Sequence, residues 1–254
     1  MHNRGMKHIP QRLFAVVLLL GWAHVSAAQT ADEVIEKSIT AMGGRAAMEK
    51  IKSRTMTGTL TLETPAGNIV GSVEILSAVP NKTRSLIKAD LSQFGAGQLV
   101  VDQRFDGTTG YVQDSLQGNR DITGKQLEGM KANSFPHPFL NYKAMGVAVT
   151  LGAAKEKAAG RDAFVLTFQP TSGSPVKQYV DAETFMPLRT VIQANAPQVG
   201  DFEQNADPSD FRVIDGVKVP FKLQLVSSVQ SVTMEFTKIE QNVAVDEKLF
   251  VKPQ

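Results

Sequence analysis

The sequence contains no cysteine, and it has only four histidines and one tryptophan among its 254 residues. Three of the histidines and the tryptophan lie within the first 28 residues, so His137 is the one histidine of the remaining chain. Without cysteine, a disulfide framework and a thiolate zinc site are both excluded. A metal site built from several imidazoles is excluded as well if the first 28 residues are removed.

Residues 1–28 have the order of a secretory signal peptide. Three basic residues and no acidic residue precede an apolar run, and small residues end that run, with cleavage after Ala27 or Ala28 fitting equally. A retained membrane anchor is the less favoured alternative, because the apolar run is shorter than the ~20 residues that a spanning helix needs. We therefore expect residues 29–254 to form a soluble periplasmic protein, and the missing cysteine excludes a lipid attached at the cleavage site.

The apparent basicity of the chain belongs to this leader. Cleavage would leave 24 basic residues against 25 acidic ones, a net charge of −1, which gives no electrostatic case for binding nucleic acid. The remaining 226 residues suffice for one sizeable core without disulfides. No linker interrupts them, so a single domain over residues 29–254 is expected. A division near residues 123–145 is less favoured.

Helix signals are few and concentrated near the start of residues 29–254. Thr30 and Glu33 have the spacing of a capping box, and Gly43 and Gly44 follow where the apolar stripe ends, which predicts a helix between them. Short helices are also predicted over residues 45–51 and 123–135, and residues 135–146 are interpreted as a loop or a short helix.

Most of the other segments alternate apolar and polar residues between turn signals. This pattern predicts about ten or eleven strands in a strongly curved antiparallel sheet, an α+β fold with the helices against the sheet. The segment from Phe211 to Leu225 has apolar residues on its odd positions, on both sides of an Asp-Gly turn. We expect these residues on one inward face, with Arg212, Lys218 and Lys222 directed outward.

Motifs for catalysis, metals and nucleotides are missing. There is no Gly-x-Ser-x-Gly elbow, no phosphate-binding glycine loop and no spacing typical of a calcium loop. His137 lies between two prolines close to Ser134, and a packed or exposed loop histidine is favoured over a catalytic base. A carboxylate pair such as Asp181 and Glu183 is better explained by turns. No catalytic residue, metal ligand or cofactor is therefore predicted, and the chain is expected not to be an enzyme.

A curved sheet that one or two helices fill only in part can hold an apolar ligand on its concave face. Burial of an acyl chain there would contribute roughly 0.8 kcal/mol per methylene. The inward-phase residues that could contact such a ligand could equally be ordinary core. These candidates are Leu60, Leu62, Val73, Ile75, Phe164, Leu166, Phe168, Leu188, Phe221, Leu223, Met234 and Phe236.

Several segments together resemble a known family. "ADEVIEKSITAMGGRAAMEKIKS", "DGTTGYVQD", "YVDAETFMPLR", "SDFRVIDGVKVPF" and "IEQNVAVDEKLFVKP" are similar, in this order, to segments of the outer-membrane lipoprotein-sorting proteins with the LolA/LolB-like fold. The resemblance implies an incomplete β-barrel wrapped around helices, with an apolar cavity for acyl chains. The chain departs from the family in its greater length than the carrier and in lacking the anchoring cysteine of the outer-membrane acceptor.

Three functional hypotheses follow from these observations, and the least favoured is an enzyme of the same fold with a polar cluster inside the cavity. The first is a monomeric periplasmic carrier or binding protein that holds lipoprotein acyl chains or another hydrophobic ligand, without chemistry. The alternative is an interaction or regulatory module that binds an envelope protein through the outer face or an edge of the sheet.

Overall fold

The computed structural model describes residues 29–196 and 200–253; the predicted signal peptide lies outside these residues. The described residues form four α-helices, with bounds α1 Ala31–Ala41, α2 Arg45–Met48, α3 Gly124–Lys131 and α4 Pro138–Asn141. Two short 3₁₀ helices accompany them, η1 Ser92–Phe94 and η2 Glu247–Leu249. All four α-helices fall within segments predicted to be helical or, for α4, a loop or short helix. No helix in the described ranges is long and apolar enough to cross a lipid bilayer.

The described part of the chain contains fourteen strands rather than the ten or eleven expected. Strands β6 and β8 were not predicted, because they have only three residues each, too few for alternation to be recognised. The bounds are β1 Ser53–Thr64, β2 Gly67–Ala78, β3 Lys82–Asp90, β4 Gln98–Phe105, β5 Gly110–Asp114, β6 Arg120–Ile122, β7 Ala148–Leu151, β8 Glu156–Ala158, β9 Arg161–Gln169, β10 Val176–Asp181, β11 Pro187–Ala196, β12 Gly200–Ile214, β13 Val217–Ser227 and β14 Ser231–Gln241.

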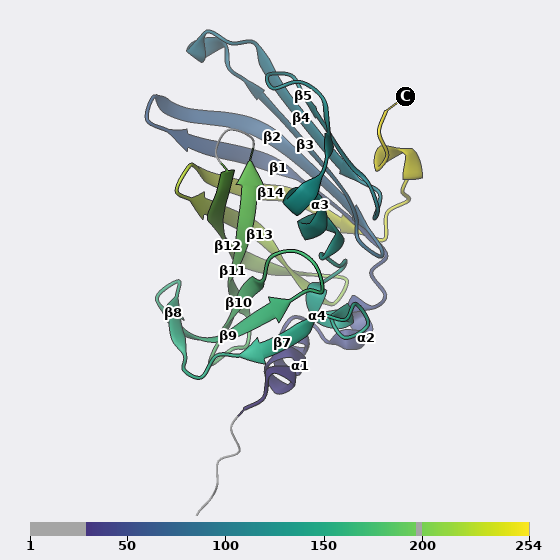
Figure 1. Ribbon diagram of the computed structural model, residues 1–254, viewed down its shortest axis with the longest axis vertical. Coiled ribbons are helices and arrows are strands. Elements are labelled where there is room, and N and C mark those ends of the chain that lie inside the picture. Colours follow the sequence, from purple (N-terminus) through teal and green to yellow (C-terminus); the bar gives the residue numbers. More distant parts are fainter. Residues whose placement is uncertain (1–28, 197–199, 254) are drawn as a thin grey trace, which may run out of the picture.

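All strand pairs are antiparallel, and neighbours in sequence are mostly neighbours in the sheet. The order is β6-β5-β4-β3-β2-β1-β14-β13-β12-β11-β10-β9-β7, with β8 paired to β9. The pairing of β1 with β14 joins the two halves of the chain, and the sheet stays open between its edge strands β6 and β7. Figure 1 shows the curved sheet, with α1, α2 and α4 gathered at one end. The fold is therefore α+β with an incomplete barrel, as predicted.

Helix α1 begins and ends as its sequence predicts. The backbone N–H of Thr30 donates to Glu33 Oε2 at 2.8 Å, and the Glu33 N–H donates to Thr30 Oγ1 at 3.2 Å, which completes the capping box. Val34, Ile35 and Ile39 are buried on one face of the helix. Their apolar stripe packs into the main hydrophobic cluster together with inward residues of the sheet.

The hairpin of β12 and β13 differs from the expected face assignment. Ile214 pairs with Val217, so each odd residue of β13 lies opposite an even residue of β12. Directly opposed residues share a face of the sheet. Arg212 therefore shares a face with Val219, whereas Val213 shares one with Lys218 and is 64% exposed. The prediction that all odd positions share one face was wrong, because a two-residue turn reverses the phase between the two strands.

The C-terminal segment covers part of the outer face of the sheet. Phe250 is fully buried in a second small cluster with Leu76 and Ala78 of β2. An ion pair between Lys82 and Glu247 and a hydrogen bond from Arg104 to the Val251 carbonyl fasten the same segment. Figure 1 shows this yellow segment beside the blue strands of the N-terminal half. The C-terminal segment thus covers apolar side chains of β2 that would otherwise be exposed on the outer face of the sheet.

Candidate functional site

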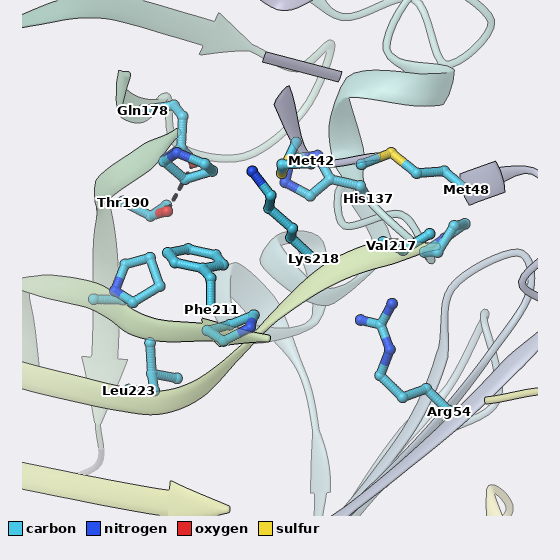
Figure 2. Close-up of a pocket in the computed structure, with 15 residues that line it drawn as sticks. Met42, Met48, Arg54, His137, Gln178, Thr190, Phe211, Val217, Lys218 and Leu223 are labelled. Carbon is cyan, nitrogen blue, oxygen red and sulfur yellow. Dashed lines mark hydrogen bonds between the residues drawn. The ribbon is translucent and has the colours of Figure 1, made fainter. Parts of the chain in front are cut away.

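A cavity of about 230 Å³ lies between the helical segments and strands β10–β13. Ten of the fifteen residues that line it are apolar, and the other five carry no negative charge. The lining residues are Met42, Met48, Arg54, Pro136, His137, Gln178, Pro187, Thr190, Ala206, Pro208, Phe211, Val217, Lys218, Pro220 and Leu223. Figure 2 shows the labelled side chains around this space. The concave side of the molecule is thus mostly filled, but a cavity remains.

The end of α1 forms one wall because the hairpin turn docks against it. The Lys218 N–H donates to the Met42 carbonyl at 2.7 Å, which fixes the first residues of β13 to the helix C-terminus. Gly43 continues the chain with φ of +125°, a conformation that side chains rarely adopt. This turn leads directly into α2, which contributes Met48 to the cavity wall.

The loop that precedes α4 forms a second wall and carries His137. His137 is the N-cap of α4, and its Nδ1 accepts a hydrogen bond from the Phe139 N–H at 3.2 Å. Phe139 stacks on Phe168 of β9 with ring centroids 5.4 Å apart, so the helix is fixed to the sheet. The Tyr142 hydroxyl donates to Asp32 of α1 at 2.6 Å. These contacts fix α4 against α1 and the sheet, and they thereby place His137 in the cavity wall.

Burial and, to a smaller extent, the nearby positive charge of Arg54 lower the pKa of His137 to about 4. The imidazole is therefore neutral at physiological pH. Because its Nδ1 already accepts the Phe139 N–H, the ring is held as a capping group. His137 is therefore a packed loop histidine, one of the two alternatives that the sequence favoured over a catalytic base.

Arg54 extends into the cavity from the beginning of β1. Its guanidinium lies over the Phe135 ring, 5.3 Å from the centroid. Its Nε is buried, and the Arg54 side chain has no hydrogen-bond or ion-pair partner among residues 29–196 and 200–253. Burial lowers the pKa of Arg54 to about 10, so the side chain is still cationic at neutral pH.

Gln178 and Thr190 supply the neutral polar groups of the cavity. The Thr190 hydroxyl donates to Gln178 Oε1 at 2.8 Å, and Gln178 Nε2 donates to the Arg189 carbonyl at 3.0 Å. Figure 2 shows the first of these bonds as a dashed line and the Lys218 side chain extending toward the space beside it. Both side chains thus have hydrogen-bond partners within the cavity wall that lies opposite His137.

The twelve residues predicted to contact a ligand lie mostly together. Eleven of them belong to the main hydrophobic cluster, seven as buried members and four as partly buried ones. Leu188 is half-buried and is not part of that cluster. Leu223 also lines the cavity, whereas the other eleven do not. Their role as ligand contacts stays a prediction.

Reasoning from the sequence missed the polar members of this site. Along β1, Arg54 lies on the same alternating phase as the inward residues Met56 and Leu60. A basic residue on this inward phase could have indicated a charged group facing the cavity. Of the three basic residues expected to point outward, Lys218 lines the cavity, Arg212 pairs with Asp210, and Lys222 pairs with Glu235. Two of the three are thus neutralised by acidic neighbours.

The acidic residues considered for catalysis have structural partners. Asp181 Oδ1 accepts the backbone N–H groups of Glu183 and Thr184 at 2.8 and 2.9 Å, and Arg161 forms an ion pair with it at 2.6 Å. Burial raises the pKa of Asp181, but these hydrogen bonds and Arg161 outweigh it and hold the pKa below its usual value. Asp181 therefore organises a turn. Within the described ranges, no group of three or more potential ligands is placed to hold a metal ion.

The fold is shared with several solved structures. A protein of the DUF1329 family from Desulfovibrio piger ATCC 29098 superposes with a TM-score of 0.54 at 13% identity, covering 86% of this chain and 95% of that one. A domain assigned to outer-membrane lipoprotein sorting, from Vibrio parahaemolyticus, gives 0.53 at 12% identity over 85% and 95% of the two chains. A LolA-superfamily protein from Nitrosomonas europaea gives 0.53 at 16% identity over 89% and 99%. The chain therefore has a LolA-like fold. No family model and no curated protein matches its sequence.

Proposed function

We propose that the chain is a periplasmic carrier or binding protein that holds a hydrophobic ligand, a lipoprotein acyl chain or another, between its helices and its sheet. The observation that carries the proposal is the cavity of about 230 Å³ with ten apolar lining residues. Apolar groups that enter such a space leave water, at roughly 25 cal/mol per Å² of buried apolar surface. The LolA-like fold and the N-terminal sequence typical of export support the same proposal.

The lining chemistry favours binding over catalysis. Among the described residues of the lining, His137 is the one whose unperturbed pKa lies near neutral pH, and in the folded chain its lowered pKa keeps it neutral as a helix cap. No carboxylate joins it among the fifteen lining residues of the described chain. General acid–base catalysis needs a group poised near the working pH, which this wall does not supply.

The test is recovery of ligand from the mature protein. The protein is purified from periplasmic extract without detergent, analysed by native mass spectrometry, and then extracted for lipids. Ala206→Phe places a ring in the cavity, and Ala144→Phe makes the same change at an exposed position outside the lining. We expect co-purified lipid with the parent chain and Ala144→Phe, and strongly reduced lipid with Ala206→Phe.

Thermal unfolding separates loss of the cavity from loss of the fold, because a ring that fills a cavity leaves the melting temperature unchanged or raised. If the parent protein carries no lipid and binds no added acyl chain, the proposal fails. Equal lipid content in a folded Ala206→Phe protein would place the ligand elsewhere.

A further inference from the structure

In the described part of the chain, the cavity lining contains basic residues but no acidic ones, and a purely apolar ligand would give no reason for this excess of positive charge. Two of its lining residues, Arg54 and Lys218, are cations, and no acidic residue of the described chain lines it. Most other basic groups in this fold have an acidic partner, as in Arg84 with Asp102 and Arg189 with Asp207. The positive charge of the cavity is therefore not balanced within its own wall.

Of the two cations, Arg54 is the stronger indication of an anionic ligand. Its Nε is buried, with no hydrogen-bond partner in the described chain, and such a group is unfavourable and uncommon in folded proteins. The Phe135 ring covers the guanidinium but offers no acceptor for the Nε proton. A carboxylate or phosphate oxygen in the cavity would neutralise the charge of the guanidinium, whose planar geometry matches both groups.

Lys218 reaches the same space from β13, which β14 separates from β1 in the sheet. Its side chain is exposed and has no ion-pair partner in the part of the chain that the structure describes. Its backbone is fixed by the hydrogen bond from its N–H to the Met42 carbonyl. Figure 2 shows its ammonium extending toward the region between Thr190 and His137, while Arg54 extends in from β1. A flexible cation at this position is suited to screening an anion that Arg54 holds.

We propose that the ligand of this cavity is an amphiphile with one apolar chain and an anionic oxygen head group, and that Arg54 binds the head group. The inference rests on the proposed function and adds the ligand class. The volume of about 230 Å³ is below the ~300–1,000 Å³ of common small-molecule pockets, so one chain fits better than the several chains of a membrane lipid. The shared chemistry is an oxyanion, as a carboxylate or a phosphate monoester.

The experiment measures the affinity of the mature protein for four probes by isothermal titration calorimetry at pH 7.5, below their micellar concentrations. The probes are dodecanoate, dodecyl phosphate, dodecanol and inorganic phosphate. We expect both anionic chains to bind at least tenfold more tightly than dodecanol, and inorganic phosphate not to bind measurably. A preference between dodecanoate and dodecyl phosphate identifies the natural head group.

Three variants test which cation is responsible for the tighter binding of the anionic chains. Arg54→Met keeps the length of the side chain and removes the charge, so it should reduce binding of the anionic chains at least tenfold and leave dodecanol unchanged. Lys218→Met should give a smaller reduction, because an exposed cation is screened by water. Lys238→Gln, an exposed cation that pairs with Glu240 outside the cavity lining, is the matched control and should have no effect.

The outcomes separate the two proposals. Equal affinity for dodecanoate and dodecanol, or an equal loss for both in Arg54→Met, would overturn the assignment of Arg54 and leave the carrier proposal intact. Absence of binding by all three chain probes would overturn the carrier proposal itself. A melting curve of Arg54→Met confirms folding, since replacing an unpaired buried charge by an apolar group is often neutral or stabilising.

Discussion

Gly43 lies directly against the carbonyl oxygen of Gly216, and a Cβ built on Gly43 would be 2.1 Å from that oxygen. The two glycines belong to the end of α1 and to the turn between β12 and β13. Their close approach allows the Lys218 N–H to reach the Met42 carbonyl at 2.7 Å. One backbone contact thus sets the distance between two walls of the cavity.

Gly43→Ala should therefore destabilise the protein by more than the strain of its positive φ alone, because the added Cβ would also collide with the Gly216 carbonyl. Gly67 is the matched control, since its φ of +123° is close to the +125° of Gly43 and its Cβ would meet nothing within 4 Å. We expect Gly67→Ala to lower the free energy of unfolding by about 1–3 kcal/mol, and Gly43→Ala by on the order of 2 kcal/mol more. Urea denaturation measures both, and equal losses would contradict the docking role of Gly43.

Asp102 should stabilise the outer face of the sheet through its two arginines. Its carboxylate is buried and accepts two hydrogen bonds from Arg84 at 2.8 Å and one from Arg104 Nη2 at 2.7 Å. Asp102→Asn removes the carboxylate that is hydrogen-bonded to both guanidinium groups, so we expect a loss of about 3–5 kcal/mol in the free energy of unfolding.

Asp210→Asn is the comparison for Asp102→Asn, because Asp210 pairs with Arg212 at an exposed position. We expect less than about 1 kcal/mol there. Burial raises the pKa of Asp102, but the hydrogen bonds from Arg84 and Arg104 outweigh it and hold that pKa below its usual value. The stabilisation is accordingly present at neutral pH and is lost as the pH falls through the folded-state pKa. Similar losses in the two variants would refute the special role of Asp102.

His137 should make stability depend on pH between about 4 and 6.5. Its pKa is about 4 in the folded chain and 6.5 when unperturbed, so the unfolded state binds the proton first as the pH falls. The stability is complete above pH 6.5 and declines below it, by about 2 kcal/mol between pH 7 and pH 5. His137→Asn keeps an N-cap acceptor and removes the titration. A decline of the same size in His137→Asn would assign it to other groups.

Phe250 should anchor the C-terminal segment to β2. The side chain is 1% exposed and packs with Leu76 and Ala78, so Phe250→Ala should cost about 3–5 kcal/mol. The adjacent Val251 is 42% exposed, and Val251→Ala should change the stability by less than about 0.5 kcal/mol. Chemical denaturation compares the two, and a small effect of Phe250→Ala would show that the segment is not held by that ring.

The amino-acid sequence by itself determined the local elements. The capping box of Thr30 and Glu33, the glycines that end α1 and the alternation of the long strands depend on residues close together in the chain. The inward phases of β1 and β14 were predicted correctly for the same reason, since Leu60 faces Met234 across the pair. Strands β6 and β8 were missed because three residues carry too little periodicity.

Only the tertiary structure decided which inward residues fill the core and which border the cavity. Leu223 lines the cavity while Phe221, two residues away on the same phase, is part of the packed cluster without lining it. That difference depends on the volume that α1, the loop before α4 and strands β10–β13 leave between them. The approach of Arg54 to His137 is decided in the same way, because distant segments meet only after the sheet has curved. Periodicity fixes the face of a side chain, whereas packing of distant elements fixes what it touches.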